Sequence, residues 1–247
     1  MSHPVMQVRN LSIAFGGLRA VDDVSFDVAR HRITTVIGPN GAGKSTLFNL
    51  ISGALKPQAG EIMIDGVDMT GLPPEKSKAA GLSRSFQITN LFFELTVAEN
   101  LRLAAQVLEP MARAFLPITK SERAQAKVED LLERFDMMAR RNELVGNLSH
   151  GDQRRLEIAV CLASEPKILL LDEPTQGMSH ADTAETARLV RSLTEDVTVL
   201  LIEHDIGLVM ELSDHVVVMH QGRKLAAGSP QEIRADPAVQ AAYFGHK

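Results

Sequence analysis

The chain has 247 residues, 45% of them apolar, and a formal net charge of -5. This size fits one α/β domain or two small ones, and the apolar fraction allows a sizeable core. A nucleic-acid-binding protein held by phosphate contacts needs a basic face, so the acidic balance argues against that class. The single cysteine, Cys161, excludes an internal disulfide, and we expect a buried, unreactive thiol there.

The first residues contain no basic run followed by an apolar stretch, so no signal peptide is expected. The longest apolar runs, 168–171 and 197–202, are much shorter than the about 20 residues that a membrane span needs. We therefore expect a soluble, cytoplasmic chain that reaches a membrane only through a partner.

The first half of the chain combines strand patterns with a helical segment. Residues 24–38 hold two β-rich runs separated by a polar turn, and residues 61–69 predict a strand with an Asp-Gly turn. Residues 97–145 favour helix and are interrupted by Pro110 and Pro117, which indicates an inserted helical subdomain.

The second half predicts a β-α-β unit. Residues 167–174 and 197–205 are short apolar runs that end in polar residues, as is typical of parallel strands buried on both faces. The segment between them, 179–196, has helical character. Residues 215–228 predict a closing hairpin.

The strongest motif is Gly38–Ser45, which spells G-x-x-x-x-G-K-S between an apolar strand and a helix start. Glycines in such a loop let backbone N–H groups turn toward a phosphate, and the following helix adds its positive dipole end. Lys44 then reaches the β- and γ-phosphates, and the Ser45 hydroxyl ligates Mg²⁺. The alternative, a glycine-rich turn without a ligand, does not require this strand and helix context.

Polar residues follow both buried strands of the β-α-β unit. Asp172 suits a Mg²⁺ shell, and Glu173 suits polarising a water for attack on the γ-phosphate, because adjacent side chains leave a strand in different directions. His204 follows the second strand and is a candidate contact for the γ-phosphate. A surface Asp-Glu-Pro turn and a structural histidine are the alternatives.

In this order the motifs resemble the nucleotide-binding subunit of ABC transporters, over essentially the whole chain. The resemblance implies a P-loop NTPase fold: a mostly parallel sheet, an N-terminal antiparallel β portion and an α-helical subdomain. It divides the single domain into an ATPase core, 1–96 and 168–247, and a helical subdomain with the signature helix at about 97–167. It implies ATP and Mg²⁺ as cofactors.

The resemblance also assigns residues. Phe15 matches the aromatic residue that stacks on adenine, and Gln87 matches the Q-loop residue, a Mg²⁺ ligand that takes part in catalysis. Glu173 is the catalytic base and His204 the switch histidine. The nucleotide-binding loop is Gly38, Asn40, Gly41, Ala42, Gly43, Lys44, Ser45 and Thr46, and the Mg²⁺ ligands are Ser45, Gln87 and Asp172.

The family mechanism brings two such chains together head to tail, with Ser149 and Gly151 of one signature contacting the ATP held by the other. The signature carries His150 and Asp152 where the family usually has Gly and Gln, and Ser179 replaces the usual Asp of the D-loop. The Asp152 charge should weaken phosphate binding by about 1–3 kcal/mol. His150, Arg154 or Arg155 could offset it, and Ser149 with Asp152 also matches a capping box.

A narrower resemblance links several segments, among them 200–230 and 233–245, to the ATPases of branched-chain amino acid importers. It implies membrane permease subunits, a second ATPase subunit in a heterodimer more often than a homodimer, and indirect work with a periplasmic solute-binding protein. The chain would then sit at the cytoplasmic face of the membrane, with no nucleic-acid partner. Similar ATPases for urea or short amides and for lipopolysaccharide export are alternatives.

Other classes fit less well. A GTPase would carry an N-K-x-D motif, and a small-molecule kinase would lack the signature and the adjacent Glu173. Non-transport ABC ATPases generally have two such domains or a long coiled-coil insert, and this chain has no heptad run. A module that holds ATP without hydrolysing it would not need Glu173.

Overall fold

The computed structural model describes residues 3–85, 91–108 and 121–244. By its internal contacts the chain divides into two compact units. The first holds Met1–Arg84, Lys167–Pro174 and Val190–Lys247, and the second holds Ser85–Pro166 and Thr175–Leu189. The division of function between an ATPase core and a helical subdomain stays a prediction.

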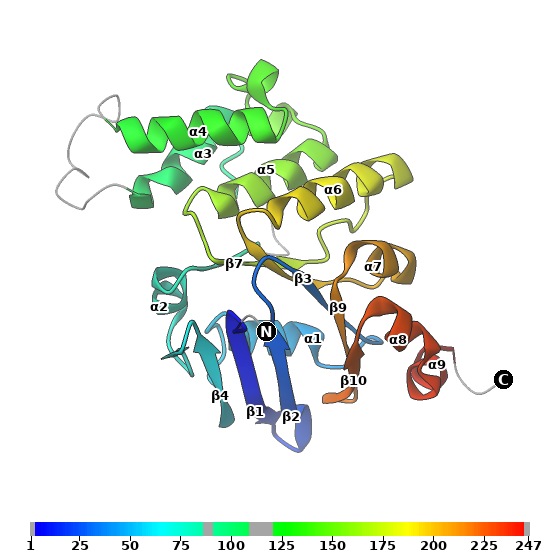
Figure 1. The fold of residues 1–247 in the computed structure, drawn as a ribbon. Coiled ribbons are helices and arrows are strands. Elements are labelled where there is room, and N and C mark those ends of the chain that lie inside the picture. The colour runs from blue at the N-terminus through cyan, green and yellow to red at the C-terminus, as the bar shows by residue number, and fades with distance from the viewer. Residues whose placement is uncertain (1–2, 86–90, 109–120, 245–247) are drawn as a thin grey trace. The chain divides into compact units, whose positions relative to one another are not determined.

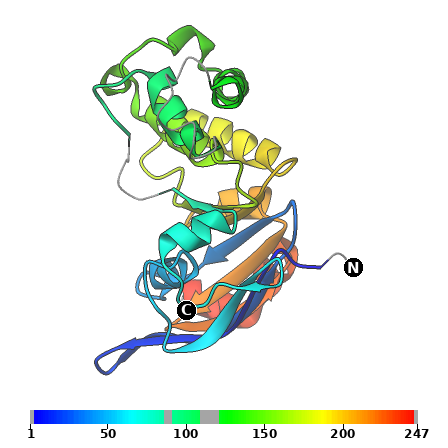
Figure 2. The same cartoon turned by 90° about the vertical axis from the view of Figure 1, so that its left-hand side faces the viewer.

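The first unit contains all the named strands, in two sheets (Figures 1 and 2). The antiparallel sheet has the order β2-β1-β4-β5, and the larger sheet has the order β10-β9-β3-β8-β7-β6. Strands β9, β3, β8, β7 and β6 run parallel, and β10 closes the edge as an antiparallel hairpin with β9. The strands are β1 (Met6–Phe15), β2 (Leu18–Val28), β3 (Ile33–Ile37), β4 (Ala59–Ile64), β5 (Val67–Asp68), β6 (Leu82–Arg84), β7 (Ile168–Asp172), β8 (Thr198–Ile202), β9 (His215–His220) and β10 (Arg223–Gly228).

The expected α/β architecture is confirmed, including the antiparallel N-terminal portion and the closing hairpin. Strands β3, β7 and β8 are buried along their whole length, which explains why their sequences are apolar without alternation. The two β-rich runs of residues 24–38 belong to different sheets, because β2 pairs with β1 and β3 pairs with β8 and β9.

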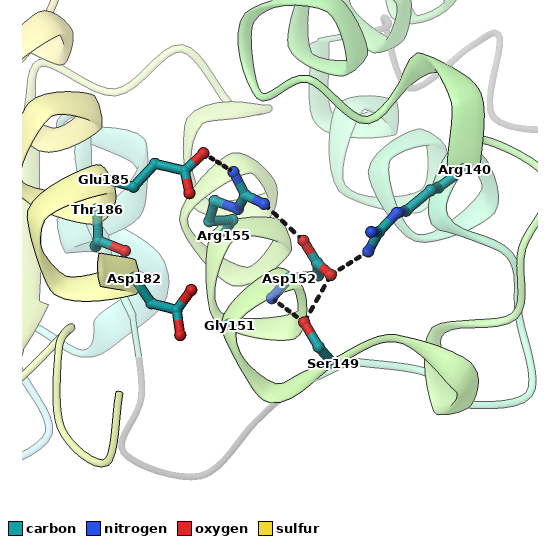
Figure 3. Close-up of a pocket in the computed structure, with 8 residues that line it drawn as sticks. All are labelled: Arg140, Ser149, Gly151, Asp152, Arg155, Asp182, Glu185 and Thr186. Atoms are coloured by element: carbon teal, nitrogen blue, oxygen red, sulfur yellow. Dashed lines mark hydrogen bonds and ion pairs between the residues drawn. The ribbon is translucent and has the colours of Figure 1, made fainter. Parts of the chain in front are cut away.

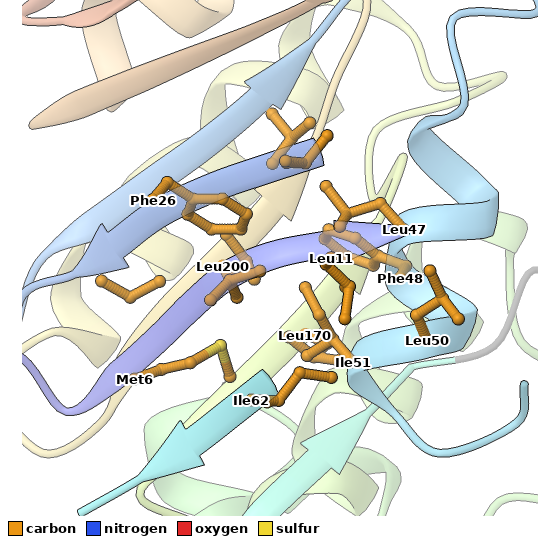
Figure 4. Packing of buried hydrophobic residues seen from close by; sticks show 14 of the residues in the cluster. Met6, Leu11, Phe26, Leu47, Phe48, Leu50, Ile51, Ile62, Leu170 and Leu200 are labelled. Atoms are coloured by element: carbon orange, nitrogen blue, oxygen red, sulfur yellow. The ribbon is translucent and has the colours of Figure 1, made fainter. Parts of the chain in front are cut away.

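Helix α1 (Lys44–Ile51) lies in a core shared by both sheets (Figure 4). Its residues Leu47 and Phe48 are fully buried among side chains from β1, β4, β7 and β8. Burial of each such side chain stabilises the fold by roughly 1.5–3 kcal/mol. The loop between β3 and α1 is therefore fixed at both ends. The other helices of this unit are α2 (Pro74–Ala79), α7 (Ile206–Leu212), α8 (Pro230–Ala235) and α9 (Pro237–Phe244).

The second unit is helical in its described part. Helix α3 packs against α4 and α5, and the 3-10 turn η4 follows α4. Thr96 begins α3 with a capping box that includes Glu99. The elements are α3 (Val97–Ala105), η1 (Gln106–Leu108), α4 (Glu122–Arg134), η4 (Met138–Arg140), η5 (Val145–Asn147), α5 (His150–Leu162) and most of α6 (His180–Leu193). Cys161 on α5 is half-buried rather than fully buried.

Candidate functional site

Three candidate segments meet at one edge of the parallel sheet, all within the first unit. Neighbouring strands β3, β8 and β7 are followed by the Gly38 loop, by His204 and by Asp172–Glu173, respectively. Carboxyl ends of parallel strands form the ligand crevice of open α/β sheets. The topology thus gathers residues that are more than a hundred positions apart in sequence.

The loop before α1 needs glycine at two positions because other backbone segments approach it closely. A Cβ on Gly38 would lie 2.3 Å from the Met219 carbonyl oxygen, and one on Gly43 would lie 2.2 Å from that of Ala20. Gly43 also has a left-handed φ of +98°. The tight loop is therefore specified by its packing as well as by any ligand.

Helix α1 begins without a side-chain cap and without an acidic residue in its first turn. Its positive end is therefore not neutralised by the chain's own side chains. Ser45 and Asn40 are exposed beside this helix start, and Thr46 and Gly43 are half-buried. The arrangement suits an anionic ligand.

The Lys44 ammonium group lies inside the loop, where it donates to the carbonyl oxygens of Gly38 at 2.7 Å and Pro39 at 3.2 Å. Burial lowers its pKa, and the negative charges of Glu173 and Asp172 act in the opposite direction. Lys44 is thus a cation held by the loop and electrostatically coupled to both carboxylates.

Asp172 ends β7 and is only 2% exposed. Arg84 approaches its Oδ2 atom at 3.3 Å and also donates to Asn49 at 2.7 Å and Ser52 at 2.9 Å. Sequence analysis missed Arg84, because no spacing rule links β6 to β7 before their pairing is known. The contacts give the buried carboxylate a fixed orientation.

Glu173 has a left-handed φ of +47° and its N–H donates to the Ile202 carbonyl oxygen at 3.0 Å. Such a conformation costs of order 1–3 kcal/mol in a residue other than glycine. The pairing of β7 with β8 maintains this conformation. Strain of this kind occurs at functional sites, which agrees with a chemical role for the carboxylate.

His204 lies between two glutamates. Its Nδ1 atom is 3.7 Å from Glu173 Oε2 and 3.8 Å from Glu203 Oε2. Glu203 is fully buried and accepts the backbone N–H of His204 at 3.1 Å, whereas the His204 side chain is 58% exposed. Glu203 was not predicted as a site residue, although it directly follows the buried strand β8. The structure thus brings His204 and Glu173 together.

Two residues that the resemblance assigns are not among the described residues that meet at the ends of β3, β7 and β8. Phe15 ends β1 and is 50% exposed, opposite Leu18 in the β1–β2 hairpin. An exposed aromatic ring is available for stacking. Gln87 lies outside the described residues.

The signature residues belong to the second unit, at the start of α5 (Figure 3). Ser149 is the N-cap, and its Oγ accepts the N–H of Asp152 at 3.2 Å. The expected capping box is wrong in one respect: the Asp152 carboxylate does not bind the Ser149 N–H. Instead it accepts the Ser149 hydroxyl at 2.6 Å, and two arginines bind its oxygens, which offers the carboxylate stronger, charged donors than a backbone N–H.

Those arginines pair with different oxygens of Asp152. Arg140 donates to Oδ2, and Arg155 donates to Oδ1 at 2.7 Å while also reaching Glu185 at 2.6 Å (Figure 3). Burial raises the pKa of Asp152, but the hydrogen bonds from Ser149, Arg155 and Arg140 outweigh this effect, so the pKa falls below its ordinary value. The carboxylate at this helix start is therefore ionised and compensated.

The expected compensation is confirmed for Arg155 but not for Arg154, which pairs with Glu157 at 2.6 Å. Arg140 was missed, because it lies twelve residues before Asp152 in a turn with no periodic signal. Together these side chains line a polar pocket of ≈ 130 Å³. Its lining is Arg140, Ser149, Gly151, Asp152, Arg155, Asp182, Glu185 and Thr186.

Helix α6 repeats the arrangement at its own start. Ser179 Oγ donates to Asp182 at 2.7 Å and accepts the Asp182 N–H at 3.3 Å. The segments Ser149–Asp152 and Ser179–Asp182 both read S-H-x-D. Ser179, which departs from the family's usual Asp, is thus a helix cap.

This fold and loop define a P-loop nucleoside triphosphatase, and the comparisons narrow the class. Residues 21–176 match the family described as ABC transporter, and residues 223–247 match the one described as Branched-chain amino acid ATP-binding cassette transporter. The chain therefore belongs to the ATP-binding subunits of ABC transporters, which bind and hydrolyse ATP and work with membrane permease partners. Among the described residues, no helix is long and apolar enough to cross a membrane.

Relatives match over nearly the full length. The high-affinity branched-chain amino acid transport ATP-binding protein LivG of Escherichia coli is 42% identical, over 99% of both chains. The corresponding protein BraF of Pseudomonas aeruginosa is 42% identical, again over 99% of both chains. A solved ATP-binding cassette of an ABC transporter in its ADP conformation is 31% identical, with a TM-score of 0.87 over 99% of this chain and 100% of that one.

Proposed function

We propose that this chain powers the uptake of branched-chain or related hydrophobic amino acids through membrane permease subunits. The observation that carries its catalytic part is the juxtaposition of the Lys44 loop, Asp172–Glu173 and His204 after three neighbouring parallel strands. The substrate class rests on the likeness to LivG and BraF and on the C-terminal match. The transported solute would not touch this subunit.

In this proposal Lys44 and the loop around it hold the phosphates of ATP. The N–H groups at the uncapped start of α1 face the anion, and Phe15 stacks on adenine. The residues of the loop that would bind the nucleotide are Gly38, Asn40, Gly41, Ala42, Gly43, Lys44, Ser45 and Thr46. The close packing of Gly38 and Gly43 supports this, because it preforms the loop.

Mg²⁺ would be held by the Ser45 hydroxyl and the Asp172 carboxylate, with Gln87 as a further ligand. Hydroxyl and carboxylate oxygens suit this hard cation, which usually takes one or two protein carboxylates and completes its shell with phosphates and water. When bound, the ion supplies charge neutralisation on the phosphate oxygens. Arg84 keeps Asp172 oriented at the strand end.

Glu173 would act as general base on the attacking water. His204 would contact the γ-phosphate, held in position by its backbone bond to Glu203. The 3.7 Å approach of His204 Nδ1 to Glu173 Oε2 supports a joint role, because it places both side chains within reach of one substrate group. General-base catalysis of this kind contributes about 10²–10⁴-fold to a rate.

The second half of each ATP site would come from another chain. Ser149 and Gly151 at the start of α5 would contact the γ-phosphate of ATP held by a partner ATPase, in a heterodimer or a homodimer. A helix N-terminus is suited to this task because its N–H groups and dipole favour an anion. The complex would sit at the cytoplasmic face of the membrane and serve a periplasmic solute-binding protein.

The test is Glu173→Gln in the full chain, with the exposed Glu195→Gln as matched control. We expect Glu173→Gln to keep ATP affinity within about twofold while kcat falls at least about 100-fold. Isothermal titration with ATP and a phosphate-release assay measure the two quantities. Undiminished turnover would remove Glu173 from the mechanism.

The solute class is tested with the complex that co-purifies from membranes with the tagged chain, reconstituted with its binding protein in vesicles. Leucine, isoleucine or valine should stimulate ATP turnover, and urea and acetamide should not. Stimulation by urea or a short amide alone would favour that importer class instead.

A further inference from the structure

Two donors share one oxygen of Asp152. Its Oδ2 atom accepts both the Ser149 hydroxyl, at 2.6 Å, and the Arg140 guanidinium. Its Oδ1 atom is bound by Arg155. Asp152 is 6% exposed, so loss of all donors at one oxygen would leave a buried charged acceptor unsatisfied, which destabilises the fold.

Ser149 has one hydroxyl hydrogen, and that hydrogen is used by Asp152. A phosphate oxygen accepts hydrogen bonds but cannot donate them, so Ser149 must turn this hydrogen away from Asp152 to bind a γ-phosphate. Because Arg140 also donates to Oδ2, that oxygen keeps a partner when Ser149 turns. Arg155 cannot replace it, since it binds the other oxygen and shares its charge with Glu185.

Charge points the same way. An ionised carboxylate in the first turn of α5 opposes an approaching phosphate. Arg140 comes from η4, outside the helix, and among the described residues its carboxylate partner is Asp152. Its side chain is 46% exposed.

We propose that Arg140 is a positioning residue of the signature: it holds and neutralises Asp152, and so frees the Ser149 hydroxyl for the γ-phosphate of ATP bound by the partner chain. This inference rests on the proposed function of the Ser149–Gly151 segment. According to this inference Arg140, which lies outside the signature, allows the signature to bind phosphate although it contains Asp152.

The test compares Arg140→Gln, Arg140→Lys and the double variant Arg140→Gln/Asp152→Asn in the full chain. Arg141→Gln is the matched control, because Arg141 is the neighbouring arginine, is similarly exposed at 40%, and pairs with Glu129 instead. Steady-state ATP turnover is measured against ATP and against protein concentration, at low and at moderate salt. Binding of ATP to the isolated chain and the melting temperature are measured alongside.

We expect Arg140→Gln to raise the protein concentration for half-maximal turnover about tenfold, which corresponds to about 1.4 kcal/mol. The effect should shrink in moderate salt, and ATP affinity of the isolated chain should stay unchanged. Arg140→Lys should lie within about threefold of the wild type. The double variant should recover most of the loss, because removal of the charge removes the need for its neutralisation.

Equal behaviour of Arg140→Gln and Arg141→Gln would overturn the inference, and so would a double variant as impaired as the single one. A loss that only follows a lower melting temperature, without rescue by Asp152→Asn, would make Arg140 a structural residue and also overturn it. Absence of ATP turnover in the wild type, both alone and in the complex that co-purifies from membranes, would instead overturn the proposed function, and the inference with it.

Discussion

The starts of α1 and α5 are two helix N-termini proposed for the same task, contact with phosphate, and they are built in opposite ways. Helix α1 has Gly43 as N-cap, no side-chain cap and no acid in its first turn. Helix α5 has Ser149 as a side-chain cap and an acidic residue in its first turn, held by two arginines. Among the described residues no side chain caps the start of α1, whereas the start of α5 is capped by Ser149, which is itself bound to Asp152.

The difference teaches how each end can release a ligand. At α1 the loop glycines and Lys44 leave donors in place, so a phosphate adds to what is there. At α5 a phosphate must exchange with bonds that already exist. In the proposed function, α1 would therefore hold the phosphates tightly, and α5 would engage them reversibly.

The largest effect is expected from a substitution in the loop before α1. Gly43→Ala places a Cβ at 2.2 Å from the Ala20 carbonyl oxygen at a left-handed φ, so the loop must move. We expect destabilisation of about 3 kcal/mol or more and a roughly hundredfold weaker ATP affinity, measured by thermal melting and calorimetry. Gly17→Ala, which meets open space at an ordinary φ, is the control and should change neither quantity by much. Wild-type affinity in Gly43→Ala would show that the loop geometry is not required.

A smaller effect is expected at the start of α5, where one substitution separates folding from contact with the partner's phosphate. A Cβ on Gly151 would lie 3.7 Å from Asp182 Cγ, an ordinary contact, so Gly151→Ala should fold normally. Alanine favours helix over glycine by about 1 kcal/mol, which should raise the melting temperature. Turnover should nevertheless fall about tenfold or more, because the methyl group would occupy the place of the partner's phosphate, while ATP binding to the single chain persists. Full turnover would argue against phosphate contact at α5.

The smallest effect is in acid. The pKa of Asp152 is lowered on folding by bonds from Ser149, Arg155 and Arg140, which overcome the opposing effect of burial. The sign follows: the unfolded chain binds this proton more readily, so the stabilisation is present above the ordinary value near 3.8 and disappears as pH falls through the lower folded value.

Hydrogen exchange of α5 amides should therefore lose about 1 kcal/mol of protection as the pH falls below about 4, the size of an N-cap. Helix α1, with no acid in its first turn, should not share this local loss. Asp152→Asn is the matched variant and should be nearly insensitive. Equal acid sensitivity in Asp152→Asn would assign the effect to other carboxylates.

Sequence alone predicted the strands and motifs that obey local rules. The phosphate loop, the buried runs of β7 and β8 and the hairpin of β9 and β10 follow from glycine spacing and from apolar runs, and the structure has them. Arg84, Arg140 and Glu203 were missed for different reasons. The first two act across contacts that only folding creates. Glu203 directly follows β8, and no motif distinguishes it from the adjacent His204.

The capping box failed for a related reason. Sequence rules for helix starts consider the chain near the cap, and Ser149 with Asp152 satisfies them. The Asp152 carboxylate is bound by Arg155, one turn further along α5, and by Arg140, twelve residues earlier and outside the helix, which rules for helix starts do not include. The roles of Gln87, of the signature and of the D-loop region remain predictions until variants are measured.

The repeated S-H-x-D starts of α5 and α6 have a consequence for the free energy with which two ATPase chains associate and separate. Each serine donates its hydroxyl hydrogen to an aspartate three residues further along, so neither hydroxyl is a free donor in the separated chain. Association would then swap one set of hydrogen bonds for another of similar number, with a small net gain. Two ATPase chains that must separate after each hydrolysis benefit from this small net gain. A partner held by many additional hydrogen bonds would dissociate slowly.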